Sequence, residues 1–536
     1  MKSTKKVIAY FTIGLFLTLI LTACASEPDE DAGGDTANDN DETEESQGGD
    51  LVISKASDAV SLDPNGSNDI PSYDVQINMF ETLVKQNQDM ELTPSLAAAW
   101  EAIEENIWEF ELQEGVTFHN GSAFNADVVK MNIERIQDPD VASSQASLFE
   151  MITDIEVVDD YTIRFTTEYP FASLPAHLAH PVSGMVAPDL IDEDYEAMEN
   201  GAEPGSKINE NPIGTGYFQF DEWVPGDFVR LTRNDDYWEE PAKLDSVTFK
   251  VTSEDLTRVA ELQTGDSHIT NPLSPSDVEQ VDAHEEASVQ QQDSVSLAYI
   301  GFNINKEPFD DQLVRQAISM AVNKENIIEG IYDGYAVPAA GPIPPGVLGY
   351  DENATGLDYD VDRARELLAE AGYEDGFETT IMTNDDRERI DSATNVQAQL
   401  AEIGIEVDIE VLEWGAYLEA TANGDHEMYV LGWVTGTGDT DYALYPLYHS
   451  QNVGTPGNRT FLEDDEVDSL LEEGRQTFDE EERHDVYQEL QEKLVDLSPN
   501  IYLHYTEYLL GVRDEVKGLE QLPTQYLMLK DVYLEN

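Results

Sequence analysis

Apolar and polar residues follow one another along this chain in two different patterns. In the first part, residues 51–54, 108–112, 155–158 and 161–166 have the composition or alternation of short strands, and the last two predict a hairpin about Asp159 and Asp160. Residues 73–85 and 125–137 instead carry apolar residues at roughly helical spacing. We therefore expect a first part rich in strands, with two helices among them.

The second part alternates between the two kinds of element. Strands are predicted over residues 379–383, 405–411 and 427–433, and helices over 313–322, 326–332, 361–371 and 392–403. Strands and helices in alternation predict an α/β lobe with a largely parallel sheet. Residues 466–475 and 480–494 form amphipathic helices, and the extended apolar run 501–512 is expected to return to the first lobe.

The start of the chain has the features of an export signal. Lys2, Lys5 and Lys6 precede an uncharged apolar run over residues 7–21, which ends in Leu-Thr-Ala before Cys24. This resembles a bacterial lipobox, so we expect residues 1–23 to be a lipoprotein signal peptide and Cys24 to be lipidated. An uncleaved anchor helix is the alternative. Since Cys24 is the only cysteine, no disulfide can form within one chain.

The segment 24–49 is expected to be a disordered tether. Residues 25–50 hold eleven acidic residues, no basic residue and hardly any large apolar residue. Such a segment cannot bury enough surface to offset the entropy of ordering it. The whole chain is 40% hydrophobic, and the part after the tether is too long for one small core, which predicts two or more lobes.

The charge balance is extreme and excludes two classes of partner. Asp and Glu number 111 against 28 Lys and Arg, for a net charge of −83. Such a surface repels nucleic acid and anionic lipid. A polycationic ligand would need its acidic residues concentrated in one cleft, whereas here they are spread along the chain. We therefore interpret the charge as an adaptation to high salt, where screening acts within about 3 Å at molar ionic strength.

Several strings occur together in an order that resembles one known family. They are Trp100, the strand 108–112, residues 115–121 (GVTFHNG), 125–128 (NADV), Arg135, 211–218 (NPIGTGYF), 233–238 (RNDDYW), 302–303 (FN), 308–309 (PF) and 314–317 (VRQA). The pattern is similar to that of the family 5 extracellular solute-binding proteins. Members of this family serve oligopeptides, dipeptides, glutathione, nickel and some sugars. The resemblance runs from about residue 51 to the end.

The resemblance implies a two-lobed α/β fold of the type II periplasmic-binding-protein kind, with an extra domain inserted in lobe one. Lobe I would comprise residues 50–82, 215–297 and 501–536, the inserted domain 83–214, and lobe II 298–500. Two hinge strands would lie near residues 297–303 and 501–505. Ligand would bind between the lobes, and an ABC permease in the membrane would recognise the closed form.

The loop after the Gly432-Trp433 pair bears on the ligand. In dipeptide and oligopeptide members, an aspartate a few residues after this pair binds the ligand's α-ammonium. Here Thr435 or Gly436 stands at that place, and the acids follow at positions 439 and 441. The string is more similar to that of glutathione-binding members and related peptide binders. We therefore expect glutathione or a short peptide as ligand.

Individual site residues follow from this loop and from scarce residue types. Asp439 is expected to pair with a ligand ammonium, and Asp441 either shares that role or only fixes the turn. Trp433 either packs over the ligand or lies under the loop. The other loop candidates, which can offer hydrogen bonds to a ligand, are Thr435, Gly436 and Thr437. Partners for a ligand carboxylate, or else for surface acids, are Arg387 and Arg389. Two weaker candidates are Asn303 and Tyr73.

The sequence also bears on three rival functions. An enzyme is disfavoured because Gly214-Thr-Gly216 lacks the lysine of a phosphate loop and no G-x-S-x-G elbow occurs, so no catalytic residue or cofactor is expected. Nickel capture would use His177 and His180, yet Pro175 and Pro181 leave barely one helical turn for them. A structural lipoprotein without ligand remains open. We expect a monomer.

Overall fold

The computed structural model describes residues 48–454 and 457–535. The predictions for the signal peptide, for Cys24 and for residues 24–47 of the tether lie outside the described residues. Among the helices of the described ranges, none combines the length and the apolar character that crossing a membrane requires.

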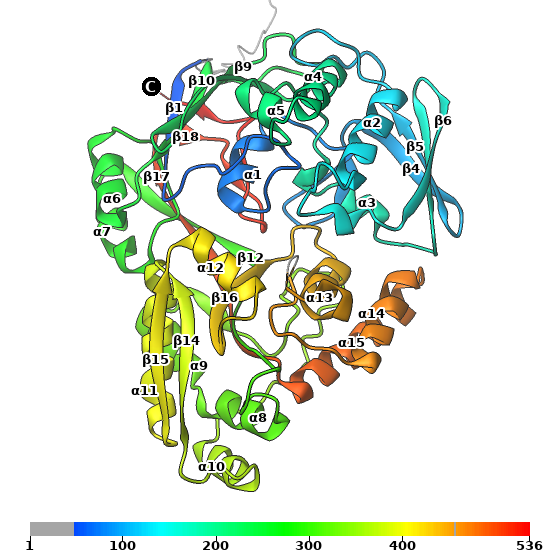
Figure 1. Cartoon of the computed structure of the whole chain (residues 1–536). Helices are drawn as coiled ribbons and strands as arrows, with labels where there is room; N and C mark the ends of the chain where they lie inside the picture. The colour runs from blue at the N-terminus through cyan, green and yellow to red at the C-terminus, as the bar shows by residue number, and fades with distance from the viewer. Residues whose placement is uncertain (1–47, 455–456, 536) are drawn as a thin grey trace, which may run out of the picture. The chain divides into compact units, whose positions relative to one another are not determined.

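A mixed sheet of eleven strands forms the framework (Figure 1). Along the sheet the order is β15-β14-β16-β12-β17-β11-β1-β10-β9-β8, with β13 paired to β17. The strands are β1 (Asp50–Lys55), β8 (Phe218–Val224), β9 (Phe228–Arg233), β10 (Ser246–Val251), β11 (Ile269–Asn271), β12 (Ala287–Phe302), β13 (Ala336–Pro338), β14 (Phe377–Asn384), β15 (Ile405–Leu412), β16 (Met428–Val434) and β17 (Asn500–Arg513).

The long strands β12 and β17 belong to both parts of this sheet. Residues 287–293 of β12 pair with β17 at 507–513, and β17 in turn pairs with β11. Residues 296–302 of β12 also pair with β16, while residues 297–301 continue to pair with β17 after a register shift between Asp293 and Leu297. We call β11, β1, β10, β9 and β8 the β1 half, and β15, β14 and β16 the β14 half. The register shift lies just before the predicted hinge segment 297–303.

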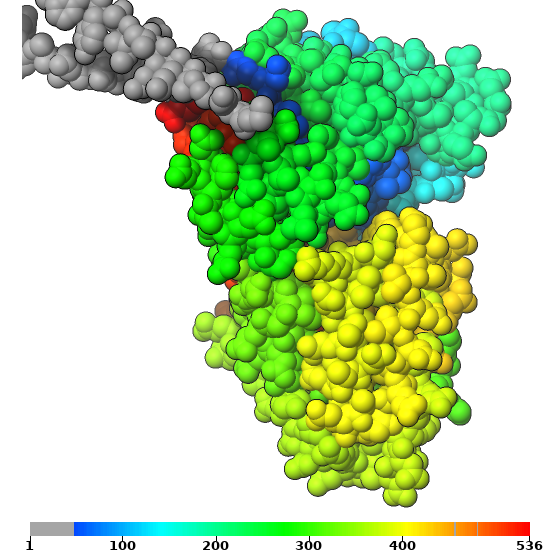
Figure 2. Space-filling view, turned by 90° about the vertical axis from the view of Figure 1, so that its left-hand side faces the viewer, coloured from blue at the N-terminus to red at the C-terminus, as the bar shows by residue number. Residues whose placement is uncertain are grey.

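The β14 half confirms the predicted alternation. Its strands β14, β15 and β16 run parallel. Ile300, Ile381 and Val430 face one core, while Leu297 and Tyr429 face another. The surrounding helices are α8 (Gln312–Ala321), α9 (Lys324–Ile331), α10 (Val361–Glu370), α11 (Arg387–Ala401), α12 (Trp414–Ala422), α13 (Thr440–Tyr448), α14 (Asp465–Gln476) and α15 (Glu480–Leu497). In Figure 2 the yellow residues of this half form one face below the green residues of the β1 half.

A separate antiparallel sheet lies within the residues of the expected insertion, which we call the inserted segment (residues 83–214). Its order is β4-β5-β7-β6, and β6 and β7 form the predicted hairpin. The elements are β4 (Ala97–Glu104), β5 (Ile107–Leu112), β6 (Ile152–Asp159), β7 (Thr162–Thr167), α2 (Ala126–Gln137), α3 (Leu174–His177), α4 (Pro188–Glu199) and α5 (Ser206–Glu210).

Smaller elements complete the fold. Three two-stranded sheets are formed by β2 (Val84–Gln86) with β3 (Leu92–Pro94), β18 (Val516–Lys517) with β21 (Tyr533–Leu534), and β19 (Glu520–Gln521) with β20 (Leu527–Met528). Helices α6 (Asp255–Thr264) and α7 (Val278–Asp282) lie beside the β1 half.

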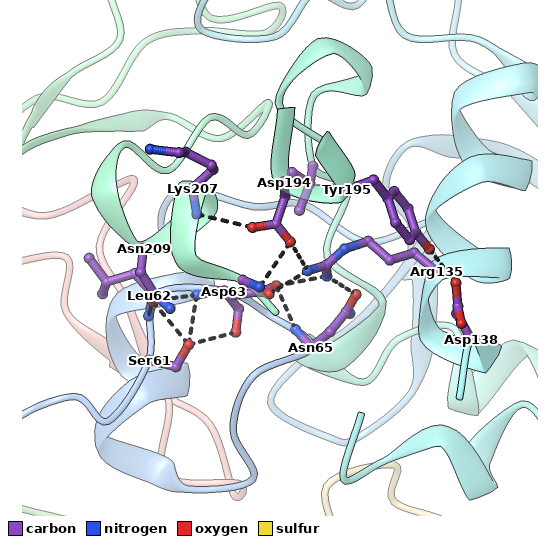
Figure 3. A network of polar contacts seen from close by, with 12 residues as sticks. Ser61, Leu62, Asp63, Asn65, Arg135, Asp138, Asp194, Tyr195, Lys207 and Asn209 are labelled. Carbon is purple, nitrogen blue, oxygen red and sulfur yellow. Dashed lines mark hydrogen bonds and ion pairs between the residues drawn. The ribbon is translucent and has the colours of Figure 1, made fainter. Parts of the chain in front are cut away.

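A buried ionic network ties the inserted segment to the loop after β1 (Figure 3). Arg135 of α2 pairs with Asp63 at 2.7 Å and with Asp194 of α4 at 3.0 Å. Asp194 also accepts hydrogen bonds from the main-chain NH groups of Gly205 and Lys207. Because every charge in it has partners, the network fixes α2, α4 and α5 against one loop.

The predicted helix over residues 73–85 is wrong in its bounds. Helix α1 spans Ile70–Gln76, starts at the N-cap Asp69, and gives way to β2. The main-chain carbonyl of Met79 accepts a hydrogen bond from Gly216 at 2.9 Å instead of bonding within a helix. A Cβ at Gly214 would lie 2.0 Å from the same oxygen, so only glycine lets the two chains approach this closely. A contact over more than 130 residues thus overrides the local periodicity.

His119 of the same region makes the fold sensitive to acid. Its Nδ1 accepts from the Gly214 NH at 3.3 Å, its Nε2 donates to the Gly216 carbonyl at 3.0 Å, and burial lowers its pKa to about 4. The unfolded side chain, with a pKa of about 6.5, binds a proton first, so stability is lost as pH falls from about 6.5 towards 4. Between pH 7 and 5, we expect His119 to account for about 2 kcal/mol of this loss.

Chemical denaturation at pH 7 and at pH 5 measures this loss of stability. The control is His119→Gln, which can keep one donor and one acceptor without titrating. An equal loss in both proteins would contradict the assignment to His119.

Candidate functional site

The two halves of the sheet meet at β12 and β17, the two neighbouring strands that run from one half into the other. At this crossing the NH of Val295 donates to the Pro523 carbonyl at 3.0 Å, and its carbonyl accepts from the Thr435 NH at 2.9 Å. Strands β1 and β11 are parallel, as are β14 and β16, so the loops after each pair leave from carboxyl ends. Sites in open α/β sheets lie outside such ends. The crossing is therefore the strongest candidate position for a functional site.

The loop after β16 contacts the inserted segment. A Cβ at Gly436 would lie 3.2 Å from Cδ2 of His180, and one at Gly438 would lie 3.0 Å from Cε of Met90. Gly438 also has φ of +67°, a conformation that favours glycine. Thr437 Oγ1 accepts from the Asp439 NH at 3.3 Å and so stays within the loop. The predicted loop thus lies against residues far from it in sequence.

Aromatic side chains form a continuous series of contacts across the same region. The Trp433 ring lies 5.2 Å from Tyr442, which lies 5.2 Å from His180. His180 in turn meets Tyr73 at 5.4 Å, and Tyr73 meets Tyr526 at 6.2 Å. Trp433 Nε1 donates to the Tyr442 carbonyl, and the Tyr73 hydroxyl to that of Ser67. The series brings Tyr73 and Trp433, two sequence-predicted residues, into one cluster.

Asp439 is fully occupied by an internal partner. It caps α13, and its two carboxylate oxygens accept from Arg483 of α15 at 2.6 and 2.7 Å. Arg483 also donates to Ser173 Oγ of the inserted segment at 2.7 Å. The geometry favours a structural role for Asp439, and its expected pairing with a ligand ammonium stays a prediction.

Asp441 has a similar but distinct arrangement. Arg475 of α14 contacts it through Nε at 2.9 Å and Nη2 at 3.2 Å, and His177 Nε2 lies 3.2 Å from Oδ2. Burial would raise the pKa of Asp441, but the Arg475 guanidinium and His177 hold it well below its usual range. Because His177 belongs to the inserted segment, this group joins it to α13 and α14.

The two arginines near the start of α11 occupy different surroundings. Arg387 is about half exposed, and its Nη1 lies 3.8 Å from Asp255 Oδ2 of α6. Arg389 donates to Asn384 Oδ1 at 3.0 Å and lies over the Trp414 ring, 5.3 Å from its centre. Both follow the carboxyl end of β14. Their expected pairing with a ligand carboxylate stays a prediction.

Asn303 lies apart from this cluster. It follows the end of β12 that pairs with Met428, at the start of β16, whereas the loop 435–438 follows the end of β16. Its Nδ2 donates to the main-chain carbonyls of Gly424 and His426 at 3.0 and 3.2 Å. The structure thus gives Asn303 a role in holding the turn before β16.

Several buried polar atoms near the crossing have no hydrogen-bond partner. Thr524 belongs to the C-terminal loop beside Val295, and Gln86 lies against Gly438. The unpaired atoms are Asp74 Oδ1, Gln86 Nε2, Asn271 Oδ1, Thr435 Oγ1 and Thr524 Oγ1. Such atoms normally find a partner, so their gathering on facing elements indicates a place for a polar molecule.

Sequence reasoning missed most of these residues. Asp74 and Asn271 carry a signal only once β1 and β11 are known to be neighbours, because each then lies near a strand's carboxyl end. The sequence also did not indicate His177, Arg475 and Arg483 as partners of the predicted acids. In the described ranges, no three His, Cys, Asp or Glu side chains come together as a metal site.

Comparison with known proteins gives consistent matches over most of the chain. Residues 91–455 match the model of the bacterial extracellular solute-binding proteins, family 5 (middle region). The glutathione-binding protein GsiB of Pectobacterium atrosepticum is 31% identical over 494 residues, which cover 90% of this chain and 94% of that protein.

Two solved structures are similar throughout. The periplasmic binding protein DppA of Helicobacter pylori, in complex with the peptide STSA, has a TM-score of 0.83 and 32% identity and covers 91% of this chain and 99% of its own. The oligopeptide-binding protein AppA of Bacillus subtilis, in complex with a nonapeptide, has a TM-score of 0.82 and 26% identity, covering 92% and 100%.

Proposed function

The chain belongs to the bacterial extracellular solute-binding proteins of family 5, and we propose that it captures a short peptide at the crossing of β12 and β17. It is a transport protein with a two-lobed fold and not an enzyme. Glutathione is the first candidate ligand, since the relative from Pectobacterium atrosepticum is a glutathione-binding protein. Di- and oligopeptides come next, as the structures of the DppA and AppA proteins contain peptides.

One observation carries the proposal. Unpaired buried polar atoms gather at the crossing, where aromatic rings from α1, the inserted segment and the β14 half also meet. A peptide offers main-chain donors and acceptors in an extended row, and in the loop of Thr435, Gly436 and Thr437 the unpaired Thr435 hydroxyl is available to them. Asp439 and Asp441, which are paired with Arg483 and Arg475, hold the end of this loop in place.

Binding is coupled to a hinge motion about β12 and β17. The inserted segment contacts α13 and α15 through His177 and Ser173, and these contacts form only when the halves are close. A ligand that contacts both halves therefore shifts the population towards the closed form. The permease subunits of an ABC importer then recognise that form.

The finer features follow from the sequence. Cys24 carries the lipid that holds the protein at the outer face of a Gram-positive-like cytoplasmic membrane, which mass spectrometry of the mature N-terminus tests. The protein works as a monomer, and its acidic surface suits a salt-rich medium. Residues 24–49 form the tether. Lobe I (50–82, 215–297 and 501–536), the inserted domain (83–214) and lobe II (298–500) are the proposed divisions.

Thermal unfolding in molar salt tests the ligand class. We expect the purified protein to be stabilised by glutathione or by one class of di- to pentapeptides, by about 2.7 kcal/mol at a concentration of 100 times Kd. Equilibrium dialysis with the same compounds gives the affinity. Free glycine and succinate serve as controls for a general effect of small anions.

Two other outcomes have different meanings. If nickel stabilises the protein and releases protons while peptides do not stabilise it, the cargo is a metal complex and not a peptide. No response to any compound would contradict the peptide proposal.

A further inference from the structure

A buried ion pair lies on the β1 side of the crossing. Lys55 is the last residue of β1, and its Nζ contacts Asp74 Oδ2 of α1. Asn271, the last residue of β11, stands beside Lys55 in the parallel register and donates from Nδ2 to the same Oδ2 at 3.3 Å. Asp74 and Asn271 are both fully buried. Three side chains from two strand ends and one helix thus meet at one carboxylate oxygen.

The other oxygens of this group are left without donors. Asp74 Oδ1 and Asn271 Oδ1 have no hydrogen-bond partner. The amide cannot be turned round to relieve this, because its oxygen would then face the Asp74 carboxylate. Both free atoms accept hydrogen bonds and neither can donate, so the missing partner must supply donors. A buried acceptor without a donor is costly, which sets this group apart from a finished structural ion pair.

Burial also disfavours the ionised form of Asp74, although Lys55 pairs with it. Burial raises the pKa of Asp74, against the opposite effects of Lys55 and of the main-chain NH of Leu527. One lysine therefore does not fully offset the burial of this carboxylate. A second cation beside it would do so.

The group lies near the β14 half as well as the β1 half. Tyr73, the neighbour of Asp74 on α1, contacts His180 at 5.4 Å, and His180 contacts Tyr442 at 5.2 Å. Tyr442 belongs to α13, directly after the loop 435–438, and contacts Trp433. A ligand held by that loop is thus close to Asp74.

Asp439 cannot easily serve the same purpose. Its oxygens are bound by Arg483, and those of Asp441 by Arg475 and His177. A ligand ammonium would have to displace a guanidinium at either position. At Asp74 it would displace no guanidinium, because Lys55 contacts Oδ2 and Oδ1 has no hydrogen-bond partner.

From these observations we propose that Asp74, together with Asn271, binds the ammonium group of the ligand on the β1 side of the crossing, and that Lys55 positions the Asp74 carboxylate. This inference rests on the proposed peptide-binding function. It assigns the selectivity for a free amine to a residue of the β1 half and not to the acids of α13.

Isothermal titration with paired probes tests the assignment. The probes are glutathione and the tripeptide Ala-Ala-Ala, each with a free and with an acetylated amino group. We expect the wild-type protein to bind the free amine at least about 30-fold more tightly than the acetylated form. In Asp74→Asn, which keeps the shape and removes the charge, we expect this ratio to fall to about threefold or less.

Two further variants make the result specific. Asp194→Asn is the matched control. Asp194 is as buried as Asp74 and is also paired with a cation, Arg135, but both of its oxygens have donors. This variant should keep the wild-type ratio. If Asp74→Asn leaves Lys55 buried alone and fails to fold, Lys55→Met/Asp74→Asn removes both charges. Either variant should lose the preference for the free amine.

The possible failures are distinguishable. If the wild-type protein binds none of the probes, the proposed function itself is contradicted. If it binds them and the ratio survives in the Asp74 variants, the peptide-binding function stands and the assignment of the ammonium to Asp74 is overturned.

Discussion

Replacement of Asp439 by asparagine lowers the free energy of unfolding by about 3–5 kcal/mol, because Arg483 is left buried without its carboxylate. Arg483 donates to both oxygens of Asp439, and both residues are almost fully buried. Denaturant unfolding in molar salt measures the change. Asparagine can still cap α13 through its side-chain oxygen, so the loss of stability is assigned to the ion pair.

A double variant separates the two roles of Asp439. In Asp439→Asn/Arg483→Met the buried charge is gone from both partners, so most of the lost stability should return. If Asp439 only holds the loop, much of the peptide affinity returns with it. If it also binds the ligand ammonium directly, stability returns and affinity does not. Unchanged stability in the single variant would contradict the ion pair itself.

Replacement of Asp441 by asparagine is expected to affect both stability and closure. Arg475 loses its carboxylate, which costs about 3–5 kcal/mol, and His177 of the inserted segment loses its contact with α13. Because the proposed hinge motion would separate the inserted segment from α13, we expect peptide affinity to fall by at least about tenfold. Unfolding experiments and titration with the tightest-binding probe measure the two effects.

His177→Phe separates these effects for Asp441. It removes the contact between the inserted segment and α13 and keeps the Asp441–Arg475 pair, so affinity should fall more than stability. Asp465→Asn, at an exposed position of α14, is the control and should change stability by no more than about 0.5 kcal/mol. An Asp441 variant with wild-type affinity would show that this contact does not contribute to closure.

The elements that could be predicted from the sequence are those fixed by local pattern. Strands over 379–383, 405–411 and 427–433 appear as β14, β15 and β16, and the amphipathic helices over 466–475 and 480–494 as α14 and α15. Residues 73–85 depart from their pattern because Met79 bonds to Gly216, a partner that no local window contains.

The same distinction applies to the candidate site. The loop 435–438 and Trp433 could be found because they follow a strand, whereas their partners depend on tertiary contacts. Arg475 lies 34 residues from Asp441, Arg483 lies 44 from Asp439, and Asn271 lies 197 from Asp74. Among 111 acidic residues, no single pairing could be chosen without the fold.

One signal for the arginines was nevertheless present. Arg483 stands on the apolar face of α15 with Tyr487, Leu490 and Leu494, at helical spacing. Arg475 likewise follows Leu471 by four residues on α14. A charged residue within an apolar stripe requires a buried partner, and both arginines have one.

The position of β17 in the sheet has a consequence for biosynthesis. Its residues 500–513 are made after every other strand of this sheet, yet they form the strand that joins β12 to β11. Until they emerge from the ribosome, the sheet consists of two separate pieces with unpaired edges, which are open to chaperones and slow to become compact. Such late completion suits a member of an extracellular family, since the native sheet cannot close before β17 has been made.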